Sequence, residues 1–503
     1  AETMRDAVAP AGRAGVVVPT GIATDDTTKP FFADLVERAG LVSLYDFENR
    51  EGLFPGVHRS YKFCLLTLAG RDRPVAGGAE FSFFCHQVAA LSDPGRRFTL
   101  SAQDLALLNP NTRTCPVFRS RRDAELTKAV YCRVPVLLSK GPPERNPWGV
   151  RLSTMFHMTN DSHLFRTREE LEAQGWALEG NTFVRGGEAM LALYEAKMVG
   201  FFDHRAADVV ISATAAVRQR QPRYLSTGEH SDPRRVVQPH SWVAAQEVSA
   251  RLDTWPGSWL LGFCDITSAT NERTVVPAVV PRAAVGNNLP LALSGAPPGR
   301  VALLGASLAS LALDFLARFK VGGTHLNFFI AEQLPVLPPE TYDQPTPWDP
   351  GQRLDDWLAD RVLELTYTAW DLESFARDLG WDGLPFRWDD ERRAFMRAEL
   401  DACFFHLYGM ERDDVDHIMG TFPIVARHDE AAWGEHRTRR LVLEAYDAMG
   451  KATETGVAYQ TVLDPPPSDP ACAHGDSPMG PGRRGPGGSG SERQPEAVRR
   501  GPG

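Results

Sequence analysis

The sequence predicts a multidomain protein of the α/β plus α+β class, with three kinds of region in order along 503 residues. Residues 1–95 alternate apolar runs of strand length with an amphipathic segment, which is the order of the second half of a Rossmann-like, doubly wound sheet with an antiparallel end. Residues 196–340 place short apolar runs between turns rich in Trp, Pro and Gly, which indicates a β-rich domain. Residues 341–463 show helical periodicity and predict a small helical domain.

The elements expected in the first region follow from its apolar runs. Residues 12–21 (GRAGVVVPTG) form a buried strand that ends in a turn, and residues 25–40 form a capped helix. Residues 41–47, 61–70 and 81–90 have strand length and are rich in aromatic and β-branched residues. The segment before them, AETMRDAVA, has the pattern of a helix interior, so we expect the chain to start inside a domain.

Three further segments complete the expected organisation. Residues 96–195 begin with a helix-start signal (TLSAQDLALL) and a basic helix, and we interpret them as a connector. An apolar helix over residues 301–319 closes the β-rich region. Residues 464–503 are dominated by Pro, Gly, Ser and Arg, which cannot bury enough apolar surface to order a chain, so a disordered tail is predicted.

Composition restricts the functional classes only slightly. A net charge of −10 gives no global attraction to nucleic acid, so any DNA contact must come from local basic patches. No apolar run of about 18 residues and no secretory signal is visible, so we expect a cytoplasmic protein without a membrane partner. The seven cysteines form no CxxC pair, which disfavours a zinc site and favours buried reduced thiols.

Eight collinear segments together resemble the C-terminal two thirds of one enzyme family. That family comprises the large adenine-specific DNA methyltransferases of type IIG restriction-modification enzymes and of the BREX and DISARM phage-defence systems. The segments are GRAGVVVPTGIATDDTTKPFF, LVSLYDFENREGLFPGVHRSYKFCLLTL, FTLSAQDLALLNPNTRTCPVFRSRRDAELT, NPWGVRLSTMFHMTNDSHLF, LYEAKMVGFFDHR, WLLGFCDITSATNERT, VGGTHLNFFIAEQLPVLPP and ELDACFFHLYGMERDDVDHIMGTFPIV.

The resemblance implies a site-specific methyltransferase that uses S-adenosylmethionine and binds double-stranded DNA. We place target recognition in residues 196–340 and not in the helical domain that follows, because this region offers loops with varied polar side chains that could reach base edges. Two required motifs are missing from the sequence: a glycine-rich cofactor loop, and an [Asn/Asp/Ser]-Pro-Pro-[Tyr/Phe] motif that would hold a flipped adenine. The string DPPP at residues 464–467 lacks the aromatic residue. We therefore predict no catalytic residue in this chain and expect no S-adenosylmethionine binding by the chain alone.

Three functional hypotheses remain open from the sequence. The first is the recognition portion of an adenine methyltransferase whose catalytic half is supplied by a separate polypeptide. The second is a free-standing sequence-specific DNA-binding protein, with steep salt dependence and no cofactor. The third is a non-functional product of a truncated gene, in which half of a parallel sheet exposes apolar surface and open strand edges.

Phe54 is the candidate for base stacking. It follows ENREG in a loop after an expected strand, and the resemblance places an aromatic ring against the flipped adenine at this position. Stacking on a base contributes about 1–3 kcal/mol. The alternative is that Phe54 simply packs beside the sheet.

Arginines supply the candidate phosphate contacts, because a guanidinium matches phosphate oxygens with a bidentate fork. One group surrounds the basic helix, where Asp123 and Glu125 are the alternative partners; it comprises Arg113, Arg119, Arg121 and Arg122. The other lies in the expected recognition region, with Tyr224 and Trp242 interleaved; it comprises Arg218, Arg220, Arg223, Arg234 and Arg235.

The segment 321–329 (VGGTHLNFF) is a further candidate for DNA contact, with Lys320 before it and Thr324, His325 and Asn327 within it. Its two glycines are expected to form a helix C-cap and a tight turn, which is the structural alternative.

Glu195 and Lys197, with Asp161 upstream, resemble a nuclease centre that would need two acids on a metal ion. The upstream acid lacks the usual preceding Pro, and the resembling enzymes carry their nuclease ahead of the methylase, so no metal site is predicted.

Overall fold

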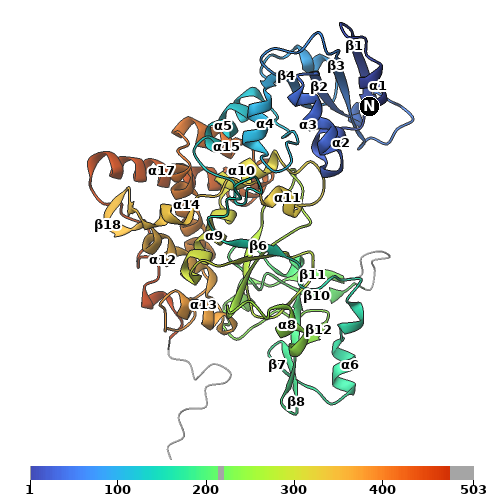
Figure 1. The fold of residues 1–503 in the computed structure, drawn as a ribbon. Helices are drawn as coiled ribbons and strands as arrows, with labels where there is room; N and C mark the ends of the chain where they lie inside the picture. Colours follow the sequence, from blue (N-terminus) through green and yellow to red (C-terminus); the bar gives the residue numbers. More distant parts are fainter. Residues whose placement is uncertain (1, 213–219, 476–503) are drawn as a thin grey trace, which may run out of the picture.

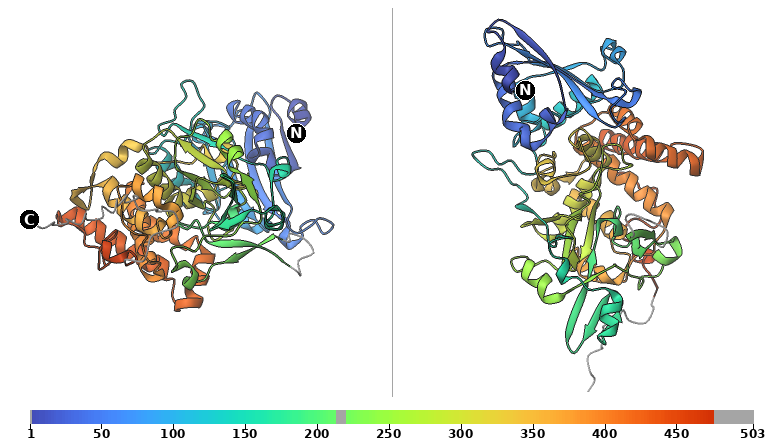
Figure 2. Two further views of the ribbon diagram at one scale, coloured as in Figure 1. Left: turned by 90° about the horizontal axis from the view of Figure 1, so that it is seen from below. Right: turned by 90° about the vertical axis from the view of Figure 1, so that its right-hand side faces the viewer.

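The computed structural model describes residues 2–212 and 220–475. It contains several sheets and many helices arranged in more than one domain, which confirms the predicted mixed α/β multidomain class. The N-terminal sheet lies at one end of the molecule and the β7–β8 hairpin at the other, as Figure 1 and the right-hand view of Figure 2 both show. The C-terminal helices lie along one side between these ends (Figure 1).

The N-terminal sheet has the strand order β1-β3-β2-β4-β5. Strand β3 is antiparallel to both β1 and β2, so β1 and β2 run parallel and are joined by helices in the manner of a βαβ unit. Strand β4 is parallel to β2. This arrangement confirms the expected strand–helix–strand order and the antiparallel end, formed by β5, whereas the position of antiparallel β3 between β1 and β2 was not predicted. The bounds are α1 Glu2–Ala7, β1 Arg13–Val18, α2 Gly21–Thr24, α3 Lys29–Glu37, β2 Leu41–Glu48, β3 Lys62–Ala69, β4 Ala79–Cys85 and β5 Phe98–Leu100.

Only one face of this sheet is deeply buried. Leu44, Leu66 and Phe81 point to the same side and belong to one buried cluster with Phe32 and Leu35 of α3. Burial alternates along β3 because successive side chains point to opposite faces. Helix α1 contributes no buried residue.

Two capped helices follow the sheet: α4, Ala102–Leu108, and α5, Arg121–Tyr131. Ser101 and Asp104 form a reciprocal capping box at the start of α4. The hydroxyl of Ser120 caps α5 by accepting a hydrogen bond from the N–H of Asp123 at 3.2 Å. The start of α4 was predicted from its helix-start signal, and α5 corresponds to the predicted basic helix.

The β-rich region begins well before residue 196. Strand β6 pairs with β16, and β9 pairs with both β12 and β15, so the connector boundary predicted at residue 196 cuts through two sheets. The sheets have the orders β14-β13-β16-β6 and β12-β9-β8-β7, and β10 and β11 form a separate hairpin. The bounds are β6 Val150–Ser153, α6 Arg168–Ala173, β7 Ala177–Glu179, β8 Thr182–Arg185, β9 Glu188–Tyr194, β10 Ala207–Ile211, β11 Arg220–Tyr224, α7 Thr227–His230, β12 Trp242–Ala244, α8 Ala245–Arg251, β13 Trp259–Phe263, β14 Pro277–Pro281, β15 Ala284–Val285 and β16 Leu291–Ser294.

The apolar segment expected as one helix over residues 301–319 forms two. Helix α9 (Pro298–Ala309) ends before Ser310, whose extended backbone and hydroxyl cap the start of α10 (Leu311–Arg318). Both helices are almost entirely buried. No single helix among the described residues is long and apolar enough to cross a membrane, although α9 and α10 together pass on length and composition with a 57° bend.

The C-terminal region consists mainly of helices, as predicted. Its core contains a buried ion pair between Arg361 and Glu399 at 2.7 Å. The bounds are α11 Phe328–Ala331, β17 Pro345–Thr346, β18 Asp349–Arg353, α12 Leu354–Thr366, α13 Glu373–Asp378, α14 Asp390–Leu407, α15 Arg412–Gly420, α16 Pro423–Trp433 and α17 Arg437–Thr455.

The disordered tail was predicted to start too early. Cys472 and Ala473 are buried, and Ala473 forms a β-bridge with Phe386. The side chain of Arg392 donates to the carbonyl of Pro465 at 2.6 Å. Local composition could not reveal these contacts, because their partners lie about 75–90 residues earlier. The rest of the predicted tail, 476–503, lies outside the described residues.

All seven cysteines are free. The prediction of buried thiols holds for Cys64, Cys85, Cys115, Cys403 and Cys472, whereas Cys132 is exposed and Cys264 is half-buried.

Candidate nucleic-acid interface

The carboxyl ends of the parallel strands β1, β2 and β4 meet at one edge of the N-terminal sheet, the edge where α/β sheets usually bind ligands. Asp46 near the end of β2 ties the three strand ends together. Its carboxylate accepts hydrogen bonds from the hydroxyl of Thr20 at 2.5 Å and from the N–H of Phe84 at 3.0 Å. Burial raises the pKa of Asp46, and these two hydrogen bonds oppose that rise.

Phe54 lies in the loop that follows this edge. The buried carboxamide of Asn49 accepts from the N–H of Phe54 at 2.9 Å and donates to the carbonyls of Phe54 and Val57 at 3.0 and 2.9 Å. The ring of Phe54 meets Phe63 edge to face at 4.9 Å, yet 43% of the residue stays exposed. Phe54 therefore packs against Phe63, as the alternative interpretation expected, and part of the residue stays exposed; base stacking remains a prediction.

Phe84 is a residue of this edge that the sequence analysis missed. Its φ is +55°, which is rare for a bulky residue and indicates a backbone held by its surroundings. The ammonium group of Lys62 and the guanidinium of Arg119 lie over its ring at 5.4 and 5.0 Å. Two cations thus lie over a ring at the end of β4, and one of them, Arg119, is a predicted phosphate contact. The local sequence of this apolar strand, FSFFC at residues 81–85, gives no indication of the positive φ at Phe84 or of the two cations over its ring.

The segment 321–329 reaches the same edge. The amino group of Lys62 donates to the carbonyl of Gly322 at 3.4 Å. Neither glycine has a positive φ, and α10 ends at Arg318 with Phe319 as its C-cap, so the predicted glycine cap is not formed.

The candidate residues in and beside that segment differ in their contacts within the protein. Thr324, His325 and Asn327 are all exposed. The Nδ1 atom of His325 lies 3.1 Å from a carboxylate oxygen of Asp265, and the carbonyl of Thr324 accepts from the N–H of Thr267 at 3.0 Å. Lys320 instead turns inward, where its amino group contacts the carbonyl of Leu108 and the side chain of Asn109. Burial lowers the pKa of Lys320 well below its ordinary value, so it is poorly placed for DNA.

The arginines around α5 do not form one free basic patch. Arg113 pairs with Glu37 at 2.8 Å, and Arg122 pairs with Asp414 at 3.1 Å. Arg121 donates to the carbonyl of Arg97 at 3.3 Å. Their partners come from distant segments, and not from Asp123 and Glu125 as the alternative interpretation supposed.

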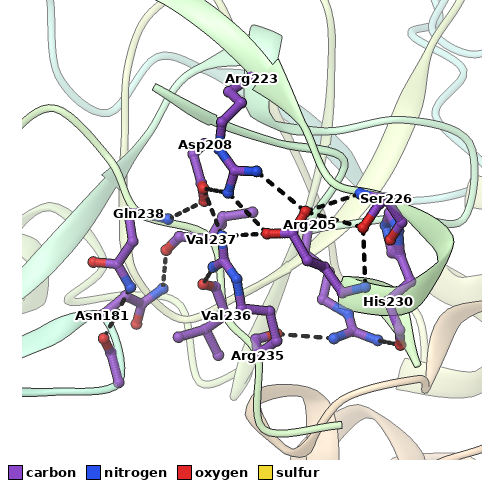
Figure 3. Close-up of polar contacts among 12 residues, drawn as sticks. Asn181, Arg205, Asp208, Arg223, Ser226, His230, Arg235, Val236, Val237 and Gln238 are labelled. Atoms are coloured by element: carbon purple, nitrogen blue, oxygen red, sulfur yellow. Dashed lines mark hydrogen bonds and ion pairs between the residues drawn. The ribbon is translucent and has the colours of Figure 1, made fainter. Parts of the chain in front are cut away.

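Arg223 belongs to a polar network at the base of the β10–β11 hairpin (Figure 3). Its guanidinium contacts Glu229 through two hydrogen bonds at 2.9 and 3.1 Å and also contacts buried Asp208. Arg235 pairs with the same Asp208 at 2.5 Å. Two predicted DNA contacts are therefore neutralised by carboxylates within the protein.

Arg205, which the sequence analysis did not single out, anchors this network to the helical region. It is fully buried and donates to the carbonyls of Asp232, Arg235, His230 and Thr368 at 2.7–2.8 Å. Through its hydrogen bond to the carbonyl of Thr368, Arg205 connects the hairpin base to the loop before α13.

The exposed side chains of the hairpin are the remaining candidates there. Tyr224 is 71% and Ile211 65% exposed, and Arg220 also faces solvent. A two-stranded ribbon with exposed side chains can enter the major groove of DNA. Trp242 is excluded as a base contact because it is buried and donates to the carbonyl of Asn181 at 2.7 Å. Arg218 lies outside the described residues.

The nuclease-like residues are brought only partly together. Lys197 pairs with Glu195 at 3.1 Å, while Asp161 pairs with Arg251 at 3.3 Å. Within 2–212 and 220–475, no group of three or more His, Cys, Asp or Glu side chains could hold a metal ion.

Comparison with known proteins found no matching family model and no matching curated protein. Among solved structures, the chain is similar to the type IIL restriction-modification enzyme MmeI in complex with DNA, with a TM-score of 0.35 and 10% identity. The match covers 87% of this chain and 50% of the other, so the chain spans about half the length of that enzyme. Values at this level do not establish a shared fold.

Proposed function

We propose that this chain is the DNA-recognition portion of a site-specific adenine DNA methyltransferase of a restriction-modification or phage-defence system. The observation that supports it most directly is the edge formed by Phe54, Phe84 and the segment 321–329. Asn49 holds the backbone of Phe54, whose ring stays partly exposed, and two cations, Lys62 and Arg119, lie over the ring of Phe84 at the end of the neighbouring parallel strand β4. Aromatic rings and cations together are the chemistry that a displaced base and its phosphates require.

The unpaired edge of β1 supports the need for a second half. Strand β1 ends the sheet, and within the described residues no strand pairs with its outer side. Val17 on this strand is 55% exposed. An edge strand with unpaired backbone N–H and C=O groups and exposed apolar side chains can pair with a strand of another chain. We propose that a strand of the catalytic half, with S-adenosylmethionine bound to that half, completes the sheet here.

The β10–β11 hairpin is the proposed reader of base sequence. Its base is fixed by Arg205 and Asp208, which leaves Arg220, Tyr224 and Ile211 at its surface. A rigid base lets a ribbon present these side chains without a large loss of conformational entropy on binding.

The test combines the chain with a polypeptide that carries a glycine-rich cofactor loop and an Asn-Pro-Pro-Tyr motif, encoded beside it in the genome. We expect methyl transfer to adenine in duplex DNA only from the mixture, measured with radiolabelled S-adenosylmethionine. Phe54→Ala should lower the rate, whereas Phe54→Trp should retain most of it. Incorporation by this chain alone would contradict the proposal. Salt-dependent DNA binding without any reconstituted transfer would favour the free-standing DNA-binding protein.

A further inference from the structure

A pocket of about 330 Å³ lies where the β-rich region, the central helices and the C-terminal helices meet. It is lined by the turn of Phe201 and Phe202, by the junction of α9 and α10, and by α14, α16 and the start of α17. Pockets of this size at domain junctions are common sites for small ligands. It is lined by none of the residues of the proposed DNA interface.

The turn that forms one wall is strained. Gly200 and Asp203 exchange backbone hydrogen bonds at 2.7 and 3.1 Å, and Phe202 at the tip has a φ of +53°. The guanidinium of Arg393 on α14 holds the turn by donating to the carbonyl of Phe202 at 3.1 Å. A bulky residue in this conformation costs of order 1–3 kcal/mol and occurs preferentially at ligand sites.

Among the described residues, Arg397 of α14 is the arginine of this pocket that forms no direct hydrogen bond; burial lowers its pKa, and the nearby carboxylates of Asp401, Asp390 and Glu272 oppose that shift. Within the described part of the chain, its side chain makes no hydrogen bond and no ion pair, although the residue is accessible to solvent. The other lining arginines are engaged: Arg273 donates to the carbonyl of Ala309, and Arg437 pairs with Glu391. The fork of Arg397 therefore keeps its donors for an incoming acceptor.

The carboxylates that line the pocket are already in contact with other groups of the protein, and the three aspartates are hydrogen-bonded. Asp401 accepts from the N–H of Leu311 at 2.6 Å, and Asp429 accepts from the N–H of Thr438 at 2.6 Å. Glu272 lies 3.2 Å from His428. Asp390 accepts from Trp388 and Thr227, both at 2.8 Å. These contacts reduce, without removing, the repulsion that an anion would meet.

Aromatic surface lies in the same pocket. The guanidinium of Arg437 covers the indole of Trp433 at 4.4 Å, and 58% of Trp433 is exposed. The ring of Phe201 stacks under Arg273 at 4.4 Å. Flat side chains beside an available guanidinium match a ligand that carries both a planar ring and an anionic group.

We propose that this pocket binds a nucleoside monophosphate, with the phosphate on Arg397 and the base against Trp433. A guanidinium recognises phosphate oxygens through paired N–H donors, and base stacking on an aromatic ring tolerates different bases. The pocket volume suits a mononucleotide and excludes a duplex. This site is separate from the DNA interface and does not depend on the proposed methyltransferase role.

The test is calorimetric titration of the full chain with AMP, with adenosine and with inorganic phosphate. We expect saturable binding of AMP and at least about tenfold weaker binding of the other two, because each lacks one half of the recognised chemistry. Equal binding of inorganic phosphate would overturn the nucleotide assignment, and so would equal binding of adenosine. Failure of AMP to bind at millimolar concentration would overturn the site itself.

Variants locate the site. Arg397→Ala and Trp433→Ala should each weaken AMP binding about tenfold or more, and Arg397→Lys should weaken it less. Arg439→Ala is the matched control, because Arg439 is an exposed α17 arginine that pairs with Asp416 and does not line this pocket. Circular dichroism melts verify folding, and Trp433→Ala remains informative if Arg397→Ala unfolds. Wild-type affinity in both pocket variants would contradict the proposal.

Discussion

The carboxamide of Asn49 clamps the backbone of Phe54 from both sides: it accepts the N–H of Phe54 at 2.9 Å and donates to its carbonyl at 3.0 Å. This pairing fixes the loop after β2, so the ring of Phe54 is presented without being buried. The loop geometry depends on Asn49, while the proposed contact depends on Phe54.

Asn49→Ala is therefore expected to destabilise the protein by about 1–3 kcal/mol, because it leaves part-buried backbone groups of the loop without the partner that Asn49 supplies. Urea denaturation measures the change. Phe54→Ala is the control: its ring is partly exposed, so its effect on stability should be smaller while its effect on DNA methylation in the reconstituted mixture should be larger. A greater stability loss for Phe54→Ala would show that the ring is mainly a packing residue.

Arg205→Leu is expected to lower the free energy of unfolding by about 3–5 kcal/mol. The substitution removes the guanidinium donor from four carbonyls around the hairpin base, and the bonds to the carbonyls of His230 and Thr368 are buried. The control is Arg220→Ala at the exposed start of β11, which should change stability by less than about 0.5 kcal/mol. Thermal and urea melts followed by circular dichroism distinguish the two, and equal melts would contradict the anchoring role.

The two arginines of β11 should behave differently towards DNA. Arg220→Ala removes an exposed cation and should reduce the slope of log K against log salt by about one, as expected for one lost phosphate contact. Arg223 is already neutralised by Asp208 and Glu229, so Arg223→Ala should leave the slope nearly unchanged. Fluorescence anisotropy with a labelled duplex at several salt concentrations measures both. The reverse order would mean that the Asp208 network opens on binding.

Asp401 predicts a pH-dependent contribution to stability. Burial raises the pKa of Asp401 to about 6, above the value of an unfolded aspartate. An acid whose pKa is raised in the folded protein stabilises the fold most when it is protonated. The contribution of Asp401 to the free energy of unfolding therefore falls as pH rises from about 4, and the loss is complete above about 6. Asp401→Asn should thus gain stability over the wild type between pH 4 and pH 7, by up to about 2–3 kcal/mol. A stability difference between the two proteins that stays constant over this range would contradict the assignment.

Truncation should separate the two parts of the predicted tail. A chain that ends at Leu463 loses the burial of Cys472 and the Arg392–Pro465 contact, so a lower melting temperature is expected. A chain that ends at Gly475 keeps both contacts and serves as the matched control. Equal melting temperatures for these two chains would show that residues 464–475 add nothing to stability.

The sequence alone determined the elements whose signals are local. Two helix starts follow from capping pairs, because such a cap is made by residues three positions apart. The pairs are Ser101 with Asp104 and Thr167 with Glu170. The apolar runs of β1, β2 and β3 likewise predicted their strands and the βαβ order, since burial of one face requires that pattern.

Only the tertiary structure decided which charges are available. Arg223 and Arg235 resemble free cations in the sequence, but Asp208 lies up to 27 positions away and meets them across the hairpin base. Lys320 likewise turns inward to Asn109, which precedes it by 211 residues. Ion pairing and burial depend on distance in space. The linear sequence therefore does not show which carboxylate or carbonyl will lie beside a given cation in the folded protein.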